Sequence, residues 1–364
     1  MRALVLWAND VSPNLGVRVL AEGHAQLVRQ VDPDAEVQFH HHGSTSAPTK
    51  VNTPRSIVRE LTPANRGFVA WVSQFDVVLD TRSGDSFADI YGLSRQLRMT
   101  GVGELCRRAG VPVVLGPQTI GPFESRRGRA MARRTLRTAA CVMARDPLSA
   151  EQAHRLGRDI DVLTTDVVFA LEQPTVGQAR DVVLNVSGLL WAPGPHVDSA
   201  SYRRTVVDLY RGLVARGRTV TLLAHVLGSS GPDDDVPAVQ EMALEVGGDP
   251  EVLVPSSLDE VRSALAGANL VIGSRMHACL NALSVDTPAI AMAYSRKFDP
   301  LMGRLGWEHG VDLRTDPDAA ASVLATIDGV DDLAAQAVQV RAAAVEQLRP
   351  ARQALAQVMG MART

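Results

Sequence analysis

The sequence contains few cysteines and no apolar stretch long enough to cross a membrane. Cys106, Cys141 and Cys279 lie far apart and form no CxxC pair, which argues against a disulfide framework, a zinc knuckle or a redox dithiol and suits a reducing compartment. Asn9 and Asp10 cut short the first apolar run, which we interpret as a strand and not as a signal peptide. No segment approaches the roughly 20 apolar residues of a membrane span. We expect a cytoplasmic protein that meets any lipid-linked substrate peripherally, at the inner face of the membrane.

A strong charge of either sign is also lacking. The 364 residues carry a net charge of -3, with 46% hydrophobic and 21% charged residues, so no global field draws the chain to nucleic acid or anionic lipid. The pairs Arg126-Arg127 and Arg133-Arg134 lie in helix-like sequence and are interpreted as solvated helix faces. A globular chain of this length exceeds one ordinary hydrophobic core, which predicts two domains.

Short β-branched runs alternate with longer amphipathic stretches, and the alternation restarts after residues 172–181. This pattern predicts an α/β fold with parallel sheets covered on both faces. We place two Rossmann-like domains at residues 1–175 and 176–364. From Leu333 onward the chain is alanine-rich and broken only by Pro350, which predicts terminal helices. If these cross back over the cleft, the architecture is glycosyltransferase-B-like, with ligands beyond the carboxyl ends of the strands. The predicted strands are 3–7, 76–80, 111–115, 141–144, 162–164, 181–186, 219–224, 252–254, 270–273 and 289–292.

The most informative segment is 271–280, where a strand is predicted to end and a helix to begin near Ser274, a good N-cap residue. The unpaired N–H groups and positive dipole of such a junction suit an anion. Arg275 adds a planar fork for carboxylate or phosphate, and His277 lies in the first turn, within reach of the same pocket. Lys297 follows the next predicted strand and is expected to point into the same cleft. The plainer alternative is a surface arginine, a packed histidine and an exposed lysine.

Two polar loops follow strands in the first half. Asp85 and Asp89 lie in a loop rich in serine and glycine. Either they cap the following helix, or they bind sugar hydroxyls and one of them accepts a proton. Gln118 and Thr119 lie between two Gly-Pro steps and form either a structural turn or a wall of a ligand site.

A further strand end carries the sequence Ala-Arg-Asp-Pro. Asp146 is interpreted as an N-cap and Pro147 as the first helical residue. That assignment leaves Arg145 free for a ligand. Asp166 lies close to the domain boundary, where a structural role is favoured.

Two clusters of metal-ligand residue types are interpreted as polar loops. Histidines occupy positions 40–42, but neighbours on an extended chain cannot all face one ion. Aspartates occupy positions 233–235 after a Gly-Ser-Ser-Gly-Pro stretch and are interpreted as a solvated loop and the charged start of a helix. No metal ion is therefore predicted.

Four segments together resemble the polysaccharide pyruvyl transferase family. They read SGDSFADIYG at 83–92, GPQTIGPF at 116–123, ARDPLS at 144–149, and GSRMHACLNAL with the following TPAIAMAYSRK over 273–297. Each is moderately specific, and they fall in order at family-like spacing. The resemblance therefore covers nearly the whole chain.

The resemblance implies an enzyme of glycosyltransferase-B-like fold with the acceptor on the first domain and phosphoenolpyruvate on the second. It implies a cyclic pyruvate ketal formed on a sugar of a cell-surface polysaccharide or glycolipid, with release of phosphate and without a cofactor. The family's R-x-H segment and later lysine, associated with phosphoenolpyruvate binding and catalysis, correspond to Arg275, His277 and Lys297. The family's N-x-G-D loop corresponds to residues 14–17, where Asn14 becomes a candidate substrate contact and Val17 replaces the usual acid.

The residue types suit this chemistry. The carboxylate and phosphate of phosphoenolpyruvate need cations and helix-end N–H groups, which Arg275, Lys297 and the helix start provide. His277 can deliver the proton that the methylene carbon requires. A second sugar hydroxyl then displaces phosphate, with Asp85 or Asp89 as the acceptor of its proton.

Two alternatives of other classes stay open. A glycosyltransferase of this architecture would bind a nucleotide diphosphate at the same helix start, with Glu308 as the candidate ribose-binding acid. A catalytically idle sugar-binding homologue would bind without transfer, although the presence of Arg275, His277 and Lys297 together speaks against it. No GxGxxG follows the first strand, which disfavours a dinucleotide-dependent dehydrogenase. The acceptor sugar, the ketal stereochemistry and any homo-oligomerisation are not fixed by the sequence.

Overall fold

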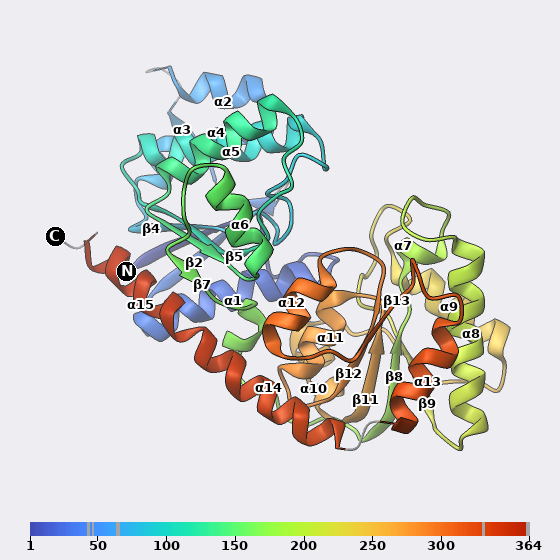
Figure 1. Cartoon of the computed structure of the whole chain (residues 1–364). Coiled ribbons are helices and arrows are strands. Elements are labelled where there is room, and N and C mark those ends of the chain that lie inside the picture. The colour runs from blue at the N-terminus through green and yellow to red at the C-terminus, as the bar shows by residue number, and fades with distance from the viewer. Residues whose placement is uncertain (42–43, 46, 63–65, 330–331, 362–364) are drawn as a thin grey trace. The chain divides into compact units, whose positions relative to one another are not determined.

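The chain forms two compact units, each built on one sheet (Figure 1). The computed structural model describes residues 1–41, 44–45, 47–62, 66–329 and 332–361. The first unit comprises Met1–Val11, Leu20–Leu171 and the chain from Val345 onward, and the second comprises Ser12–Val19 and Glu172–Ala344. The predicted division at 175/176 is corrected in two respects. The main crossing falls between Leu171 and Glu172, and one short segment near each terminus belongs to the opposite unit.

The first unit holds a seven-stranded sheet in the order β3-β2-β1-β4-β5-β6-β7. Neighbouring strands are parallel except for β2 and β3, which are antiparallel. The strands are β1 (Arg2–Leu6), β2 (Glu36–His41), β3 (Ser44–Thr45), β4 (Val77–Asp80), β5 (Val113–Gln118), β6 (Cys141–Ala144) and β7 (Val162–Leu163). All four residues of β4 and of β6 are buried, as expected for parallel strands covered on both faces.

Helices cover both faces of this sheet, with α3, α4 and α5 on one face and α1 and α15 on the other (Figure 1). On α5 the buried residues are Gly128, Ala132, Thr135 and Leu136, at helical spacing, and Ser125 caps its first turn. The helices are α1 (Leu15–Val31), α2 (Pro54–Glu60), α3 (Gly67–Val72), α4 (Leu93–Arg108), α5 (Arg126–Thr138), α6 (Pro147–Arg155), the 3-10 helix η1 (Val167–Ala170) and α15 (Arg349–Met361).

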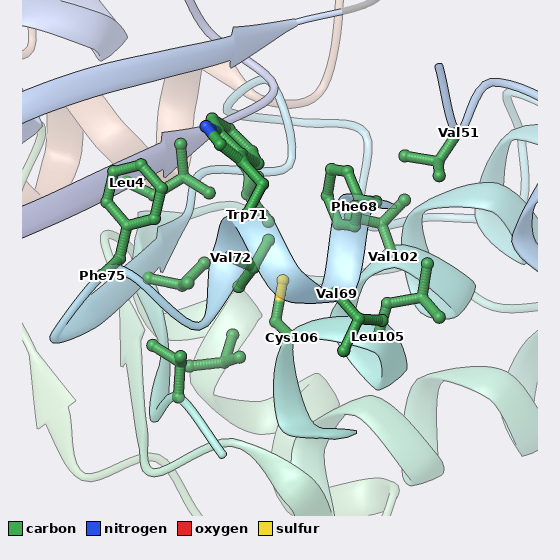
Figure 2. Close-up of a cluster of buried hydrophobic side chains, with 14 of the residues drawn as sticks. Leu4, Val51, Phe68, Val69, Trp71, Val72, Phe75, Val102, Leu105 and Cys106 are labelled. Carbon is green, nitrogen blue, oxygen red and sulfur yellow. The ribbon is translucent and has the colours of Figure 1, made fainter. Parts of the chain in front are cut away.

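The core between β1, β4 and the helices α3 and α4 is aromatic and aliphatic (Figure 2). Phe68, Trp71 and Phe75 lie ring against ring, with centroids 5.6 and 5.0 Å apart in successive pairs. Cys106 is buried in this cluster, and burial raises the pKa of its thiol far above the usual range. Cys106 therefore contributes to the packing of the core as a protonated thiol.

The second unit holds a six-stranded parallel sheet in the order β10-β9-β8-β11-β12-β13. Its strands are β8 (Arg180–Asn185), β9 (Val220–Leu223), β10 (Val252–Leu253), β11 (Ala268–Gly273), β12 (Ala289–Ala293) and β13 (Gly310–Asp312). The helices α8, α9 and α13 lie on one face and α10, α11 and α12 on the other (Figure 1). The helices are α7 (Gly188–Trp191), α8 (Ser199–Ala215), α9 (Asp235–Val246), α10 (Leu258–Ala266), α11 (Met276–Leu283), α12 (Phe298–Leu305), α13 (Ala319–Gly329) and α14 (Leu333–Gln347).

The predicted strand-helix alternation and the two Rossmann-like halves are confirmed. The predicted return of the carboxyl-terminal helices is also confirmed, because α15 packs against β6 and β7 of the first unit. The strands β2, β3 and β13 were not predicted. Within the described residues, no helix combines the length and the apolar character that crossing a membrane requires.

Candidate functional site

The carboxyl ends of four adjacent strands of the second unit carry a dense group of polar side chains. The strands lie in the order β9-β8-β11-β12. Asn185 ends β8, His225 follows β9, and Ser274 and Arg275 follow β11. Because all strands are parallel, these residues meet at one edge of the sheet, the carboxyl edge at which ligands bind in open α/β folds. Each of these four residues is buried.

The start of α11 is built differently from the prediction. The helix begins at Met276 and its N-cap is Arg275, without a side-chain cap, so the assignment of Ser274 as N-cap is corrected. The hydroxyl of Ser274 instead lies 2.8 Å from the hydroxyl of Tyr202, which accepts the N–H of Ser187 at 2.9 Å. The N–H of Arg275 donates to Asn185 Oδ1 at 2.9 Å. Long-range partners thus fix the entry to the helix.

The guanidinium of Arg275 is bound by two aspartates. Its Nη1 donates to Asp233 Oδ1 and its Nη2 to Asp235 Oδ1, each at 2.6 Å, and Nη2 also donates to the carbonyl of Asp233 at 2.7 Å. Burial by itself would lower the pKa of Arg275, but the charges and hydrogen bonds of these aspartates raise it above its usual range. Arg275, which was predicted to bind an anionic substrate, therefore already has two anionic partners within the protein.

Asp235 is a hub that ties three strand ends together. It is fully buried, and it also accepts the N–H groups of Gly188 at 2.7 Å and of His225 and Val226 at 3.0 Å. The interpretation of residues 233–235 as a solvated loop is therefore wrong for Asp235. Asp234 caps α9, which confirms the predicted start of a helix there.

Asn14 lies beside His277, in the second unit and not in the first domain where the sequence division placed it. Its Oδ1 accepts the N–H of Gly16 at 2.9 Å. A Cβ on Gly16 would lie 2.8 Å from Nδ1 of His277, so only glycine leaves room for this imidazole. The N–H of Leu15 donates to the carbonyl of His225 at 3.1 Å, which docks the amino-terminal loop on the end of β9.

A second histidine, His225, contacts both α11 and the amino-terminal loop. It is buried, and its Nε2 lies 3.2 Å from Nδ2 of Asn281 on α11. Burial, followed by the charges of His277 and Arg275, lowers its pKa well below the usual value, so it is neutral. Neither His225 nor Asn281 was predicted from the sequence. The signal that could have found His225 is a histidine directly after a strand of buried aliphatic residues.

Lys297 is the N-cap residue of α12. Burial, then the positive charges of Lys297 and of Arg275, lower the pKa of His196. The ring of Tyr294, at the end of β12, lies 5.3 Å from the ring of His196. The positive charges of Lys297 and Arg275 therefore both influence the same imidazole, and their convergence on one ligand stays a prediction.

The first unit has its own polar cluster at the ends of β5 and β6. Arg145 is buried, donates from Nη1 to Asp166 Oδ2 at 2.6 Å, and donates from Nε and Nη2 to the hydroxyl of Thr119 at 3.1 Å. The prediction that Arg145 is free for a ligand is wrong, whereas the structural role of Asp166 is confirmed. Asp146 caps α6 and Pro147 begins it, as predicted. Gln118 is fully buried, and its amide has no hydrogen-bond partner among the residues that the structure describes.

The two candidate bases, Asp85 and Asp89, accept hydrogen bonds from different parts of the first unit. Asp89 accepts the N–H groups of Glu124 at 3.0 Å and of Ser125 at 2.8 Å, and the hydroxyl of Ser125 at 2.8 Å. Burial alone would raise its pKa, but these hydrogen bonds together outweigh burial and lower the pKa. Asp85 accepts the hydroxyl of Tyr91 at 2.9 Å. Neither residue caps α4, whose N-cap is a glycine.

The remaining predictions concern metals and the ribose-binding acid. Among the described residues, no group of three or more histidine, cysteine, aspartate or glutamate side chains is arranged to hold a metal ion. Of the three consecutive histidines, the one at position 42 lies outside the described residues. Glu308 lines a hollow of about 350 Å³ between α12 and β13, together with Trp307, His309 and Asp312.

Solved structures resemble this chain over its full length. HepE of Anabaena, in a complex with UDP and glucose, is 13% identical with a TM-score of 0.58 and covers 99% of this chain and 100% of its own. MurG of Acinetobacter baumannii is 12% identical with a TM-score of 0.51 and covers 99% of each chain. UDP-GlcNAc 2-epimerase of Methanocaldococcus jannaschii is 10% identical with a TM-score of 0.56 and covers 90% of this chain and 92% of its own. These likenesses define the fold as glycosyltransferase-B-like.

Sequence comparison narrows this class to one family. The polysaccharide pyruvyl transferase family matches residues 14–296, which is more than half of the chain. The chain therefore belongs to the polysaccharide pyruvyl transferase family. The match starts at Asn14 and ends one residue before Lys297. AmsJ, an amylovoran biosynthesis protein of Erwinia amylovora, is 24% identical over 306 residues, which are 78% of this chain and 72% of AmsJ.

Proposed function

We propose that this protein transfers the pyruvyl group of phosphoenolpyruvate to a sugar of a cell-surface polysaccharide or glycolipid, forming a cyclic ketal and releasing phosphate. The observation that carries the proposal is the placement of His277 in the first turn of α11, against the Asn14–Gly16 loop and beside Arg275. Membership of the pyruvyl transferase family and the likeness to an amylovoran biosynthesis protein support it.

The donor would bind at the amino-terminal end of α11. Its carboxylate and phosphate are both anionic, and the first N–H groups of a helix together with its dipole attract such groups. In this proposal Lys297, whose charge lowers the pKa of the same His196 imidazole as that of Arg275, supplies a second cation. Arg275 contributes only if the donor shares or displaces one of its aspartates. Asp233, whose side chain is 40% exposed, is the partner that can yield, whereas Asp235 is inaccessible.

The chemistry then follows in two steps at C2 of the donor, an addition and then a substitution. His277 delivers a proton to the methylene carbon, and a sugar hydroxyl adds to the electrophilic C2 as its own proton leaves. A second hydroxyl of the same sugar attacks C2, the bond from C2 to the phosphate oxygen breaks, and phosphate departs with the bonding electrons. The product is a ketal with a methyl group, a carboxylate and two sugar oxygens on C2.

Asp85 is the better candidate for the base that accepts a hydroxyl proton. Asp89 already accepts three hydrogen bonds that favour its charged form, which makes it a weak base. Asp85 accepts the hydroxyl of the exposed Tyr91. Both carboxylates belong to the first unit, which is the proposed acceptor side.

The test is donor binding measured by thermal unfolding with phosphoenolpyruvate, UDP and GDP in turn. A ligand at about 100 times its Kd stabilises the fold by about 2.7 kcal/mol. Lys297→Ala is the informative variant, because Arg275→Ala would also leave Asp235 buried without its cation. Lys50→Ala, at an exposed position of the first unit, is the matched control.

Stabilisation by phosphoenolpyruvate that Lys297→Ala loses and Lys50→Ala retains would support the proposal. Stabilisation by a nucleotide alone would refute it and favour a nucleotide-sugar glycosyltransferase. Release of phosphate from phosphoenolpyruvate in the presence of the acceptor glycan, lost in His277→Ala, then distinguishes a working transferase from an idle homologue that only binds.

A further inference from the structure

Three helices of the first unit carry a large excess of arginine. Together α2, α4 and α5 hold twelve arginines and two glutamates, a net charge of +10, in a chain whose net charge is -3. Six of the arginines lie on α5, which has no acidic residue. From the sequence, the pairs Arg126-Arg127 and Arg133-Arg134 were interpreted as solvated helix faces. In the fold, the three helices that carry these arginines lie next to one another.

The three helices form one continuous surface, which we name the arginine face. It consists of the exposed side chains of α2, α4 and α5 and of Leu61, which follows α2. Nη2 of Arg108, at the end of α4, donates to the carbonyl of Leu61 at 3.5 Å, and Nε of Arg134 on α5 donates to Glu104 of α4 at 2.6 Å. Figure 1 shows the same helices side by side.

The acids of these helices do not neutralise the face. Glu60 is buried, and its carboxylate accepts backbone N–H groups of α3. Glu104 pairs with two arginines of α4 and α5. Arg126, Arg133 and Arg137 are exposed on the side of α5 opposite its core residues, and within the described part of the chain they have no ion-pair partner.

Apolar side chains stand among these cations. Val58 is 61% exposed, Leu61 42% and Leu97 46%. A guanidinium matches the geometry of a phosphate, and apolar side chains next to cations enter the boundary between head groups and acyl chains. A dissolved polyanion would make use of the cations only. The combination therefore fits a lipid surface better than a soluble anionic polymer.

We propose that the arginine face docks this protein on a bilayer that contains anionic phospholipid. The inference goes beyond the proposed pyruvyl transfer and does not depend on it, since it concerns a surface and not the chemistry of the site. Its consequence for that function is that docking would bring the enzyme to sugars carried on lipid. Since no described helix can span a membrane, the binding is peripheral and reversible, and it weakens as ionic strength rises.

The experiment is co-sedimentation of the whole protein with vesicles of phosphatidylcholine, alone or mixed with phosphatidylglycerol. The test variant is Arg126→Glu/Arg133→Glu on α5. The matched control is Arg204→Glu/Arg211→Glu on α8, which changes the net charge equally at exposed positions with the same spacing. Each basic residue near an anionic bilayer contributes roughly fivefold in binding, so the test variant should lose about 30-fold or more.

We expect binding to the anionic vesicles only, lost in the α5 variant and retained in the α8 variant, with the unfolding temperature of both variants unchanged. A third variant, Leu97→Ser, should weaken vesicle binding without changing binding to heparin. Three outcomes would overturn the proposal: no binding to anionic vesicles, equal losses in the two double variants, or binding to heparin without binding to vesicles. The last would assign the face to a soluble polyanion.

Discussion

The two aspartates that hold Arg275 should contribute very unequally to stability. Asp235 is fully buried and bridges three strand ends, whereas the side chain of Asp233 is 40% exposed. The perturbation is the replacement of each aspartate by alanine in turn. Both replacements remove a 2.6 Å contact with the same guanidinium, so the comparison isolates the effect of burial.

The magnitudes follow from the surroundings of each carboxylate. Removing one partner of a buried pair costs about 3–5 kcal/mol, because the other charge is left without compensation. Asp235→Ala also strands three buried N–H groups, which places its cost at the upper end of that range. An exposed ion pair contributes about 0–1 kcal/mol, so Asp233→Ala should cost less than about 1 kcal/mol.

The assay is urea unfolding at neutral pH, followed by circular dichroism, for the wild type and both variants. Equal losses in the two variants, or a loss below about 1 kcal/mol for Asp235→Ala, would refute the view that Asp235 is the hub of the site. The same variants report on the donor. If phosphoenolpyruvate displaces Asp233 from Arg275, Asp233→Ala should bind phosphoenolpyruvate more tightly than the wild type, while Asp235→Ala should bind it more weakly.

Two further predictions follow from close packing and from buried histidines. Gly16→Ala should lower transferase activity at least tenfold without a matching loss of stability, because the new Cβ would lie 2.8 Å from Nδ1 of His277; Gly103→Ala, with open space around it, should leave activity unchanged. Burial lowers the pKa of both His24 and His40 to about 4, so each stays neutral in the folded state while the unfolded chain takes up a proton below pH 6.5. The free energy of unfolding should therefore fall by about 2 kcal/mol per histidine between pH 7 and pH 5. A urea midpoint that stays constant over this interval would contradict this, as would a His24→Gln variant whose stability depends on pH as steeply as that of the wild type.

The arrangement of elements was predictable because it depends on patterns within short windows. β-Branched runs and amphipathic stretches alternate in both halves, and most predicted strands formed. The strand β2 escaped prediction because its residues are largely half-buried. The strands β3 and β13 escaped it because they span only two and three residues. The N-cap at Asp146 was also predictable, since its partner is the N–H of Ser149 three residues away.

The partners of the site residues were not predictable, because they lie far away in the chain. Ser274 was expected to cap a helix, but Tyr202, 72 residues away, holds its hydroxyl. Arg145 was expected to be free, yet the fold places Asp166 2.6 Å from it. A charged side chain that is buried must find a counter-charge, and local sequence does not indicate which one.

By itself the sequence determined the fold class, because the periodicity of apolar residues and the turn residues record local preferences. It also determined the family, because the short motifs at the strand ends are local features of the chain. Only the tertiary structure decided that Asn14 lies beside His277, that Asp235 holds Arg275, and that the arginines of three helices share one face. These relations depend on which strand ends lie side by side and on which helices pack together. That adjacency arises when the apolar faces are buried as a whole, and no short segment encodes it.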